Sequence, residues 1–319
     1  MAVNLGVKRK NYNKLKDNVV SYIYLLPFLA IFIIFLGYPV FYSFYLSFHK
    51  ATIYSDWYNV FGSMKFVGLD NYIKLLTLDR EFWWSLLATF YYGILTVPTG
   101  IALSLFLAIL LNNKLKGTSF FRSAYFLPNI LDLLVIGIIW ILLYSPQYGL
   151  IDVILNKFGI TYFSTKGFLG DPLTVLPAIA VAMVLKGAGF GMVLFLTAIQ
   201  NIDPAVYEAA DIDGANWWQK LWYITIPLVK PIILFMVITG TIGCLNAFTE
   251  VYAMTSNTGG PTMQALGATV RSAQVSGYLL YKNFSDGFYG YAAAISFILL
   301  GITLIISIIN MKLLKPEEN

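Results

Sequence analysis

Six stretches of mostly apolar residues divide the chain, and each is long enough to cross a lipid bilayer. They occupy approximately residues 19–48, 86–111, 124–144, 173–199, 231–254 and 288–313. A helix of about 20 residues spans a hydrocarbon core of roughly 30 Å. Within lipid the backbone has to satisfy its own hydrogen bonds, which favours helices over irregular chain. The pattern therefore predicts an all-α integral membrane protein whose six-helix domain covers residues 19–313.

Composition supports a location in the membrane. Hydrophobic residues make up 58% of the chain and charged residues only 12%, whereas soluble domains typically carry about 25% charged residues. Many aromatic residues lie near the ends of the apolar runs, as in interfacial belts. The first run is longer than the apolar region of a signal peptide and lacks a small-residue cleavage site, so we expect it to be retained.

The distribution of Lys and Arg predicts the orientation. Basic residues are dense in the N-terminal tail and in the short loop after the second run: Lys8, Arg9, Lys10, Lys14, Lys16, Lys114, Lys116 and Arg122. Short basic segments stay in the cytoplasm, and this explains the positive charge better than nucleic-acid binding does. We expect cytoplasmic tails at residues 1–18 and 314–319, with the long polar segments after the first, third and fifth runs outside.

The longest cytoplasmic connection lies between the fourth and fifth runs, at residues 200–230. A plain reversal needs only a few residues, whereas this segment has the pattern of two short helices. Asp203 and Pro204 form a helix-start signal, because Asp caps a helix and Pro suits its first position. Gly214 suits the left-handed end of that helix, and a second helix follows and stops near Pro227. We predict a compact helical hairpin here.

Several kinds of chemistry lack their residues. The sequence contains no G-x-x-x-x-G-K-[ST] phosphate loop, so nucleotide hydrolysis by that route is not expected on this chain. The single histidine, His49, and the single cysteine, Cys244, lie in different runs, which leaves a metal site or a Cys–His nucleophile without its partners. We therefore expect no catalytic residues, no metal and no cofactor on this chain. Ionisable residues inside the runs are few, so the energy for transport is expected from a partner.

Polar and aromatic residues in the fourth and fifth runs are candidates for a substrate path. Lys186 lies well inside the fourth run, where an unpaired charge is costly. Asn246 and Glu250 are four residues apart and share a helix face, with Phe248 and Tyr252 nearby. On a pore-lining face the polar side chains would hydrogen-bond a polar solute and the aromatic rings would stack on it. The alternatives are a Glu250 at the outer interface and a Lys186 that pairs with an acid or with backbone carbonyls of a neighbouring subunit.

Three local signals predict structure rather than chemistry. Gly187 and Gly191 are four residues apart and are expected mainly to allow close helix packing. Asp132 follows a proline-containing stretch and is expected to start a helix or to lie near the headgroups. The Gly-Pro-rich residues 258–261 predict a turn on the outer side.

The predicted hairpin carries a motif with long, fixed spacing. Glu208-Ala209-Ala210 is followed by three residues, Gly214, nine residues and Ile224-Thr225-Ile226-Pro227. This resembles the EAA motif of ABC-importer permeases, E-A-A-x3-G-x9-I-x-L-P, with Ile226 where Leu is usual. Other stretches, together with the residues from Trp217 onward, are similar to the carbohydrate-uptake branch that includes the MalF and glycerol-3-phosphate permeases: Phe66-Val67-Gly68-Leu69-Asp70-Asn71-Tyr72, Phe126-Leu127-Pro128, Tyr148-Gly149-Leu150, Gly259-Gly260-Pro261 and Tyr289-Gly290-Tyr291-Ala292-Ala293-Ala294.

The resemblance implies an architecture and a set of partners. In that family two related permeases form a heterodimeric pore in a bacterial-type cytoplasmic (inner) membrane. Two cytosolic ABC ATPase subunits bind MgATP, and an extracellular or periplasmic solute-binding protein delivers a sugar or oligosaccharide. The hairpin would be the coupling helix that lies in a groove of the ATPase, through Glu208, Ala209, Ala210, Asp213, Gly214, Ile224 and Pro227. The binding protein would contact the outer turn at Gly259, Gly260 and Pro261.

Two other classes of protein stay open on the residues alone. An ion-coupled secondary carrier for a small polar solute would transport without an ATPase, although the sparse carboxylates inside the runs argue against it. A membrane enzyme, such as a lipid-linked glycosyl transferase, would need a clustered acidic or metal site, for which Asp211 and Asp213 are the one candidate pair. Loss of function on removing ATP would separate the importer from both.

Overall fold

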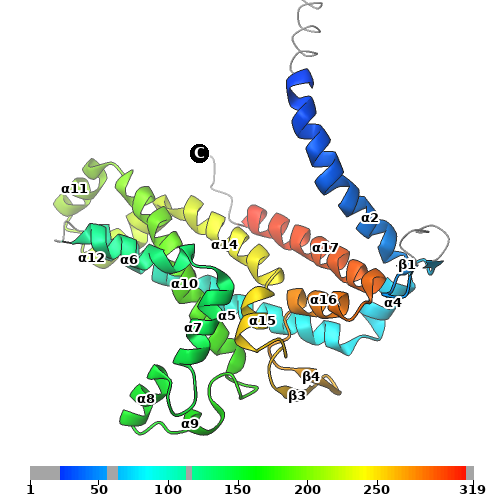
Figure 1. Ribbon diagram of the computed structural model, residues 1–319. Helices are drawn as coiled ribbons and strands as arrows, with labels where there is room; N and C mark the ends of the chain where they lie inside the picture. Colours follow the sequence, from blue (N-terminus) through cyan, green and yellow to red (C-terminus); the bar gives the residue numbers. More distant parts are fainter. Residues whose placement is uncertain (1–21, 56–63, 113–116, 314–319) are drawn as a thin grey trace, which may run out of the picture. The chain divides into compact units, whose positions relative to one another are not determined.

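The chain forms two compact units. The computed structural model describes residues 22–55, 64–112 and 117–313 (Figure 1). The N-terminal unit consists of Met1–Asn71 and Gly287–Ala294. The main unit consists of Tyr72–Asp286 and Ile295–Asn319. The tails predicted at residues 1–18 and 314–319 lie outside the described residues.

The described chain is mostly helical, as predicted. Four helices are long and apolar enough to cross a membrane: Tyr22–Ser47, α5 (Arg80–Asn112), α10 (Val175–Gln200) and α17 (Tyr289–Leu313). The first contains a π-helical turn, η1 (Ile33–Gly37), followed by α2 (Tyr38–Ser47). Two bent pairs of helices also qualify, so the described residues hold four candidate spans, or up to six if each pair is one span.

Shorter elements connect the long helices. They are β1 (His49–Lys50), β2 (Lys65–Phe66), α4 (Asp70–Thr77), α8 (Leu150–Lys157), α9 (Phe163–Lys166), α15 (Thr249–Met254), β3 (Thr262–Ala265), β4 (Ala268–Arg271) and α16 (Ser276–Ser285). The strands form two antiparallel pairs, β1 with β2 and β3 with β4. In β3–β4, Thr262 pairs with Arg271 and Ala265 with Ala268, so the strands join in a tight turn.

The third and fifth predicted runs are not single straight helices. In the third, α6 (Thr118–Ile130) and α7 (Leu133–Leu143) meet at 104°. Asp132 causes the restart, because its carboxylate accepts a 2.8 Å hydrogen bond from the backbone N–H of Leu134 and caps α7. The fifth contains α14 (Lys230–Leu245) and, after a non-helical break, α15 (Thr249–Met254). A bend of 65° also separates α14 from the preceding Trp217–Leu228. The predicted helix start at Asp132 is confirmed.

The core of the main unit lies where α5, α10 and α14 pack together. Gly189 on α10 allows the close approach of α6, because a Cβ there would overlap the carbonyl oxygen of Tyr125. Gly191 likewise allows the close approach of α5, because a Cβ there would overlap the side chain of Ser104. Gly187 has open space beside it. The packing role predicted for two glycines therefore holds for Gly191, whereas Gly187 borders a cavity.

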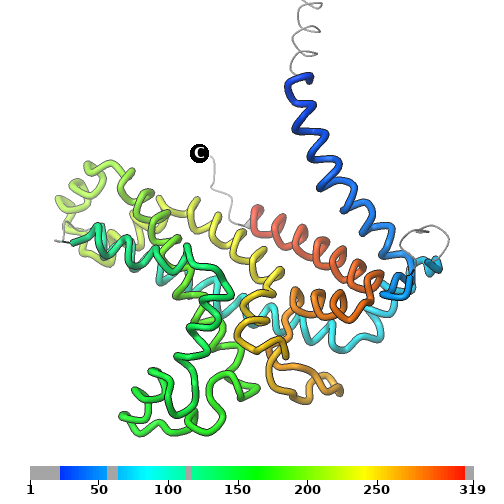
Figure 2. The backbone as a smooth tube through the Cα atoms, in the orientation of Figure 1, coloured from blue at the N-terminus to red at the C-terminus, as the bar shows by residue number. Residues whose placement is uncertain are grey.

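Helix α5 connects two distant ends of the main unit (Figure 2). At its start, Arg80 donates a 2.7 Å hydrogen bond to the carbonyl of Gly267, and Trp84 donates one of 2.8 Å to the carbonyl of Arg271. At its far end, Ile109 and Asn112 border the segment between α10 and α14. A straight helix of this length spans about 50 Å. The β3–β4 hairpin and the α10–α14 connection therefore lie at opposite ends.

The N-terminal unit explains two of the stretches that carry the family resemblance. The amide of Asn71 donates to the backbone carbonyls of Ser47 and His49, at 2.8 and 3.2 Å. Gly290 donates its N–H to the carbonyl of Ala51 at 3.0 Å, and a Cβ at Gly290 would overlap the His49 carbonyl oxygen. The first turn of α17 is thereby held against the β1 segment.

Candidate functional site

The connection between α10 and α14 begins as the sequence predicts. Helix α11 covers Pro204–Ile212, and the Asp203 carboxylate accepts a 2.9 Å hydrogen bond from the N–H of Ala205. Gly214 has φ of +74°, a left-handed conformation that favours glycine. A Cβ at Gly214 would meet no atom within 4 Å, so backbone conformation rather than space demands glycine there. The predicted helix start and left-handed turn are confirmed.

The second half of the connection is the predicted second helix, Trp217–Leu228, with an unpredicted π-helical turn inside it. Helix α12 covers only Trp217–Lys220, and the chain continues through a π-helical turn, η2 (Leu221–Thr225), into α13 (Ile226–Leu228). This helical stretch ends at Leu228, before the 65° bend into α14, so the predicted stop near Pro227 is confirmed. Proline is tolerated there because it lies in the first turn of α13, where a missing N–H costs little.

Two contacts fasten the halves of this hairpin, defined here as residues 203–228. The ammonium of Lys220 forms an ion pair with Asp211. The hydroxyls of Tyr207 and Thr225 lie 3.0 Å apart and share a hydrogen bond. Because both contacts join the first helix to the second, the hairpin can move as one piece.

The motif residues differ in exposure. Those with exposed side chains or backbone are Glu208, Ala209, Asp213, Gly214 and Pro227, whereas Ala210 is buried and Ile224 is half-buried. Large apolar side chains are also exposed on the hairpin, with Ile212 at 88% and Trp218 at 63%. Exposed apolar surface beside the exposed carboxylate of Glu208 is typical of a protein-binding face.

A cavity of about 420 Å³ lies in the middle of the main unit. It exists because α14 ends at Leu245 and α15 begins only at Thr249, which leaves a non-helical break inside the fifth apolar run. Irregular backbone at membrane depth is tolerated where it lines a cavity. The break brings Asn246, Phe248 and Glu250 to the cavity wall.

Side chains from α5 complete this central cavity. The hydroxyl of Tyr92 donates a 3.3 Å hydrogen bond to Oε1 of Glu250. Phe248 packs against Tyr281, with ring centroids 4.2 Å apart, and the ring of Tyr252 packs against both. The Asn246 amide N–H donates to the carbonyl of Ile242 at 2.9 Å, so the amide oxygen of Asn246 remains as an acceptor. The arrangement offers acceptors, several hydroxyls and an aromatic face.

Two predicted path residues do not line the central cavity. Tyr252 supports Phe248 instead. Lys186 lies beside the lining residue Gly187, and its ammonium reaches 3.5 Å from the carbonyl oxygen of Asn129. This carbonyl partner lies within the chain itself, and the partnership of Lys186 with a neighbouring subunit stays a prediction.

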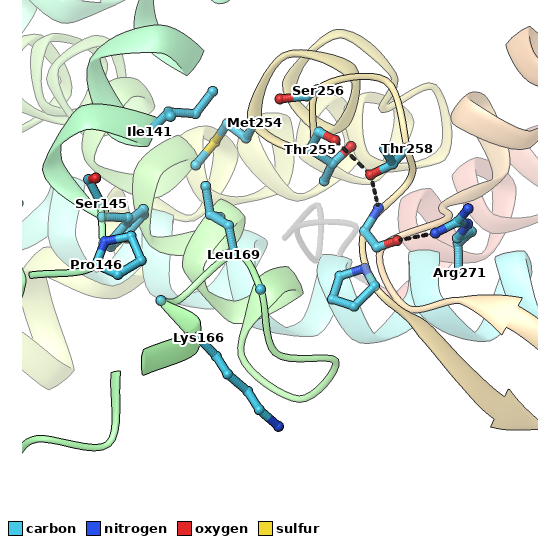
Figure 3. Close-up of a pocket in the computed structure, with 15 residues that line it drawn as sticks. Ile141, Ser145, Pro146, Lys166, Leu169, Met254, Thr255, Ser256, Thr258 and Arg271 are labelled. Atoms are coloured by element: carbon cyan, nitrogen blue, oxygen red, sulfur yellow. Dashed lines mark hydrogen bonds between the residues drawn. The ribbon is translucent and has the colours of Figure 1, made fainter. Parts of the chain in front are cut away.

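A second pocket, of about 390 Å³, lies at the end of the main unit that holds β3–β4 (Figure 3). Of the predicted outer-turn residues, Gly260 and Pro261 line it. Gly259 supports the turn from behind with φ of +72°, where a Cβ would come within 2.8 Å of the Tyr278 ring. Arg271 donates a 3.3 Å hydrogen bond to the Gly260 carbonyl. We call this the outer pocket.

Sequence reasoning missed several of these residues. Tyr92 on α5 reaches the central cavity, and its polar character in an apolar run was the available signal. Lys166 and Arg271 line the outer pocket, although they lie more than a hundred residues apart in sequence. Asn216 and Gln219 form a capping box at the start of α12, which the Asn-x-x-Gln spacing indicates.

Known proteins resemble this chain over nearly its whole length. The lactose transport system permease protein LacF of Rhizobium radiobacter is 34% identical over 295 residues, which is 92% of this chain and 93% of LacF. The trehalose/maltose transport system permease protein MalF of Thermococcus litoralis is 32% identical and covers 94% of this chain and 95% of its own length.

Solved structures share the fold. A chain of a bacterial alginate ABC transporter, in complex with an alginate pentasaccharide-bound periplasmic protein, superposes with a TM-score of 0.76 at 21% identity, covering 95% of this chain and 96% of that one. Residues 100–314 match the family model described as "Binding-protein-dependent transport system inner membrane component". The chain therefore belongs to this family of transporter permease subunits.

Proposed function

We propose that this chain is the permease subunit of an ATP-driven ABC importer and forms half of a translocation pore for a sugar or oligosaccharide. The observation that carries the proposal is the break between α14 and α15, which places Asn246, Phe248 and Glu250 in a cavity inside the span bundle. Relatives named for lactose and for trehalose/maltose transport favour a sugar as the solute. A solute-binding protein would deliver it.

The proposed orientation follows from the loop charges together with the fold. With six spans, the basic N-terminal tail and the hairpin lie in the cytoplasm, because short basic segments stay inside. The outer pocket then faces the extracellular or periplasmic side, since it lies at the opposite end of α5. A second homologous permease completes the pore, and two cytosolic ABC ATPases that bind MgATP supply the energy.

The hairpin is suited to couple the ATPases to the cavity. Glu208 offers an exposed carboxylate for an Arg or Lys of the partner, and Trp218 offers apolar surface. The hairpin connects the end of α10 to the start of α14. Both helices contribute to the central cavity, through Gly187 and Gly240 respectively. Movement of the fastened hairpin would therefore shift two walls of the cavity together.

Sugar recognition at the cavity follows from its chemistry. A pyranose ring presents a C–H face that packs on an aromatic ring, and hydroxyls that bind carboxylates and amides. Phe248 supplies the ring. Glu250 and Asn246 supply hydrogen-bond acceptors, and Tyr92 holds Glu250 in place. Few strong contacts suit a transporter, because the solute has to leave as well as enter.

Reconstitution in proteoliposomes tests the proposal. The chain, its partner permease, the ATPase and the binding protein are assembled, and uptake of radiolabelled lactose, trehalose and maltose is measured with MgATP inside. We expect uptake that requires both MgATP and the binding protein and that survives ionophores. Uptake that persists without MgATP and disappears with ionophores would replace the importer by an ion-coupled carrier.

A further inference from the structure

The outer pocket has an uneven distribution of charge. Its fifteen lining residues include the cations Lys166 and Arg271 and no carboxylate. The remaining polar lining consists of hydroxyls and backbone, among them Ser145, Ser256 and Thr258. A concave site with cations and no anion attracts a negatively charged group.

Neither cation has an ion pair in the part of the chain that the structure describes. There, the ion pairs are Lys220 with Asp211 and Lys282 with Glu81. Arg271 uses Nη1 for the carbonyl of Gly260. A guanidinium carries five N–H donors, so most of its donors stay available to a ligand.

Asp171, which interacts with Lys166, accepts hydrogen bonds from other groups. The carboxylate of Asp171 accepts hydrogen bonds of 2.8 Å from the N–H of Leu173 and of 2.8 Å from the hydroxyl of Tyr162. These two bonds, the backbone one first, hold the pKa of Asp171 below its ordinary value, and Lys166 adds a weaker attraction. Asp171 therefore stays ionised and offsets part of the Lys166 charge, so the attraction of the pocket for an anion rests mainly on Arg271.

The wall of the pocket is held in shape before any ligand arrives. Gly260 has φ of +88°, and Ser256 has φ of +50°. The Gly260 N–H donates to the hydroxyl of Thr258 at 3.3 Å, and the Thr258 hydroxyl donates to the carbonyl of Thr255 at 2.7 Å. Such a wall loses little conformational freedom on binding.

The two cations lie on different segments around the cavity (Figure 3). Arg271 stands beside the Gly260–Pro261 wall, whereas Lys166 lies on the α9 segment and extends outward. A carboxylate that enters the pocket would form its strongest bond with the fork of Arg271. Lys166 at the rim would mainly attract it during approach.

We propose that the outer pocket binds an Asp or Glu side chain on the docking face of the solute-binding protein. This inference rests on the proposed function, which puts that partner at this end of the molecule. Met254 and Thr255 at the end of α15 line the pocket, and Thr249 and Glu250 at its start line the central cavity. Docking at the end of α15 therefore acts on the helix that carries Glu250. Along the helix axis, Glu250 lies about 8 Å from the residues that line the outer pocket.

The test is binding-protein-stimulated ATP hydrolysis by the complete transporter, titrated with sugar-loaded binding protein. For Arg271→Glu we expect at least a tenfold increase in the half-maximal binding-protein concentration, and for Lys166→Glu a smaller increase that shrinks at high salt. Arg271→Lys should recover part of the loss, because it keeps the charge without the fork. Lys157→Glu is the matched control, since Lys157 is exposed in the same outer segment but does not line the pocket.

The outcomes separate the possible sources of the carboxylate. If an acidic residue of the binding protein is the ligand, reversing its charge to Lys restores stimulation of Arg271→Glu. If the half-maximal concentration stays unchanged in Arg271→Glu and Lys166→Glu, the docking proposal is overturned. A change confined to uptake of carboxylated sugars would overturn it in favour of a sugar subsite. Absence of stimulation in the unaltered transporter would instead refute the proposed function.

Discussion

The Tyr92 hydroxyl donates a 3.3 Å hydrogen bond to Glu250 and so joins the middle of α5 to the first turn of α15. Tyr92 is 3% exposed, and the direction of the bond is fixed because a carboxylate only accepts. The contact orients the one carboxylate that lines the central cavity. A carboxylate held in this way keeps an acceptor toward the cavity and loses little freedom when a solute binds.

Removing either partner should weaken transport without unfolding the protein. For Glu250→Gln we expect the KM for sugar uptake to rise about tenfold, because a hydrogen bond to a charged group contributes about 1.5–3 kcal/mol. Tyr92→Phe should raise KM by a smaller factor. Tyr91→Phe is the control, since Tyr91 is the exposed neighbour on α5. Equal KM values in all three variants would remove Glu250 from the substrate path.

Glycine positions on α10 provide a second prediction. In Gly189→Ala the new methyl group overlaps the carbonyl of Tyr125, so the thermal midpoint of the purified protein should fall, with a cost of about 1–3 kcal/mol. Gly187→Ala meets open space and gains helix propensity of up to about 1 kcal/mol. Its midpoint should hold or rise while sugar uptake changes. The reverse order of midpoints would contradict the packing of α10 against α6.

The hairpin provides a third prediction. Glu208 is exposed, so Glu208→Ala should leave the thermal midpoint nearly unchanged. We expect at least a tenfold loss of ATP-driven uptake and weaker co-purification of the ATPase in mild detergent. Glu208→Asp should retain part of the uptake, because the charge remains. Full coupling in Glu208→Ala would show that the partner does not use this carboxylate.

Low pH should destabilise the segment between α9 and α10, because it protonates Asp171. The pKa of Asp171 is lowered in the folded protein, first by the N–H of Leu173 and then by the hydroxyl of Tyr162. A lowered folded pKa gives stability that is present above the unfolded value of about 3.9 and is lost as pH falls through the folded pKa. Asp171→Asn should therefore have a lower thermal midpoint than the unaltered protein at pH 7, and the gap should narrow toward pH 3. A gap independent of pH would exclude this role.

Much of the fold could be predicted because each signal depends on neighbours in sequence. Apolar length predicts spans, since transfer of a side chain into lipid depends on its own chemistry. Asp203 caps α11 and Gly214 adopts a left-handed turn for reasons that lie within a few residues. The spacing from Glu208 to Pro227 identifies the hairpin in the same way.

Tertiary structure decided what those signals do not contain. Hydropathy reports neither the direction of a helix axis nor the point at which a helix breaks. The 104° bend at Asp132 and the break after Leu245, both inside apolar runs, were therefore not visible in the sequence. The central cavity needed the packing of α5 against α10 to bring Tyr92 to Glu250. The outer pocket needed the fold to bring Lys166 and Arg271 to one cavity. Contacts between distant residues follow from how helices cross, and only the folded chain sets those crossings.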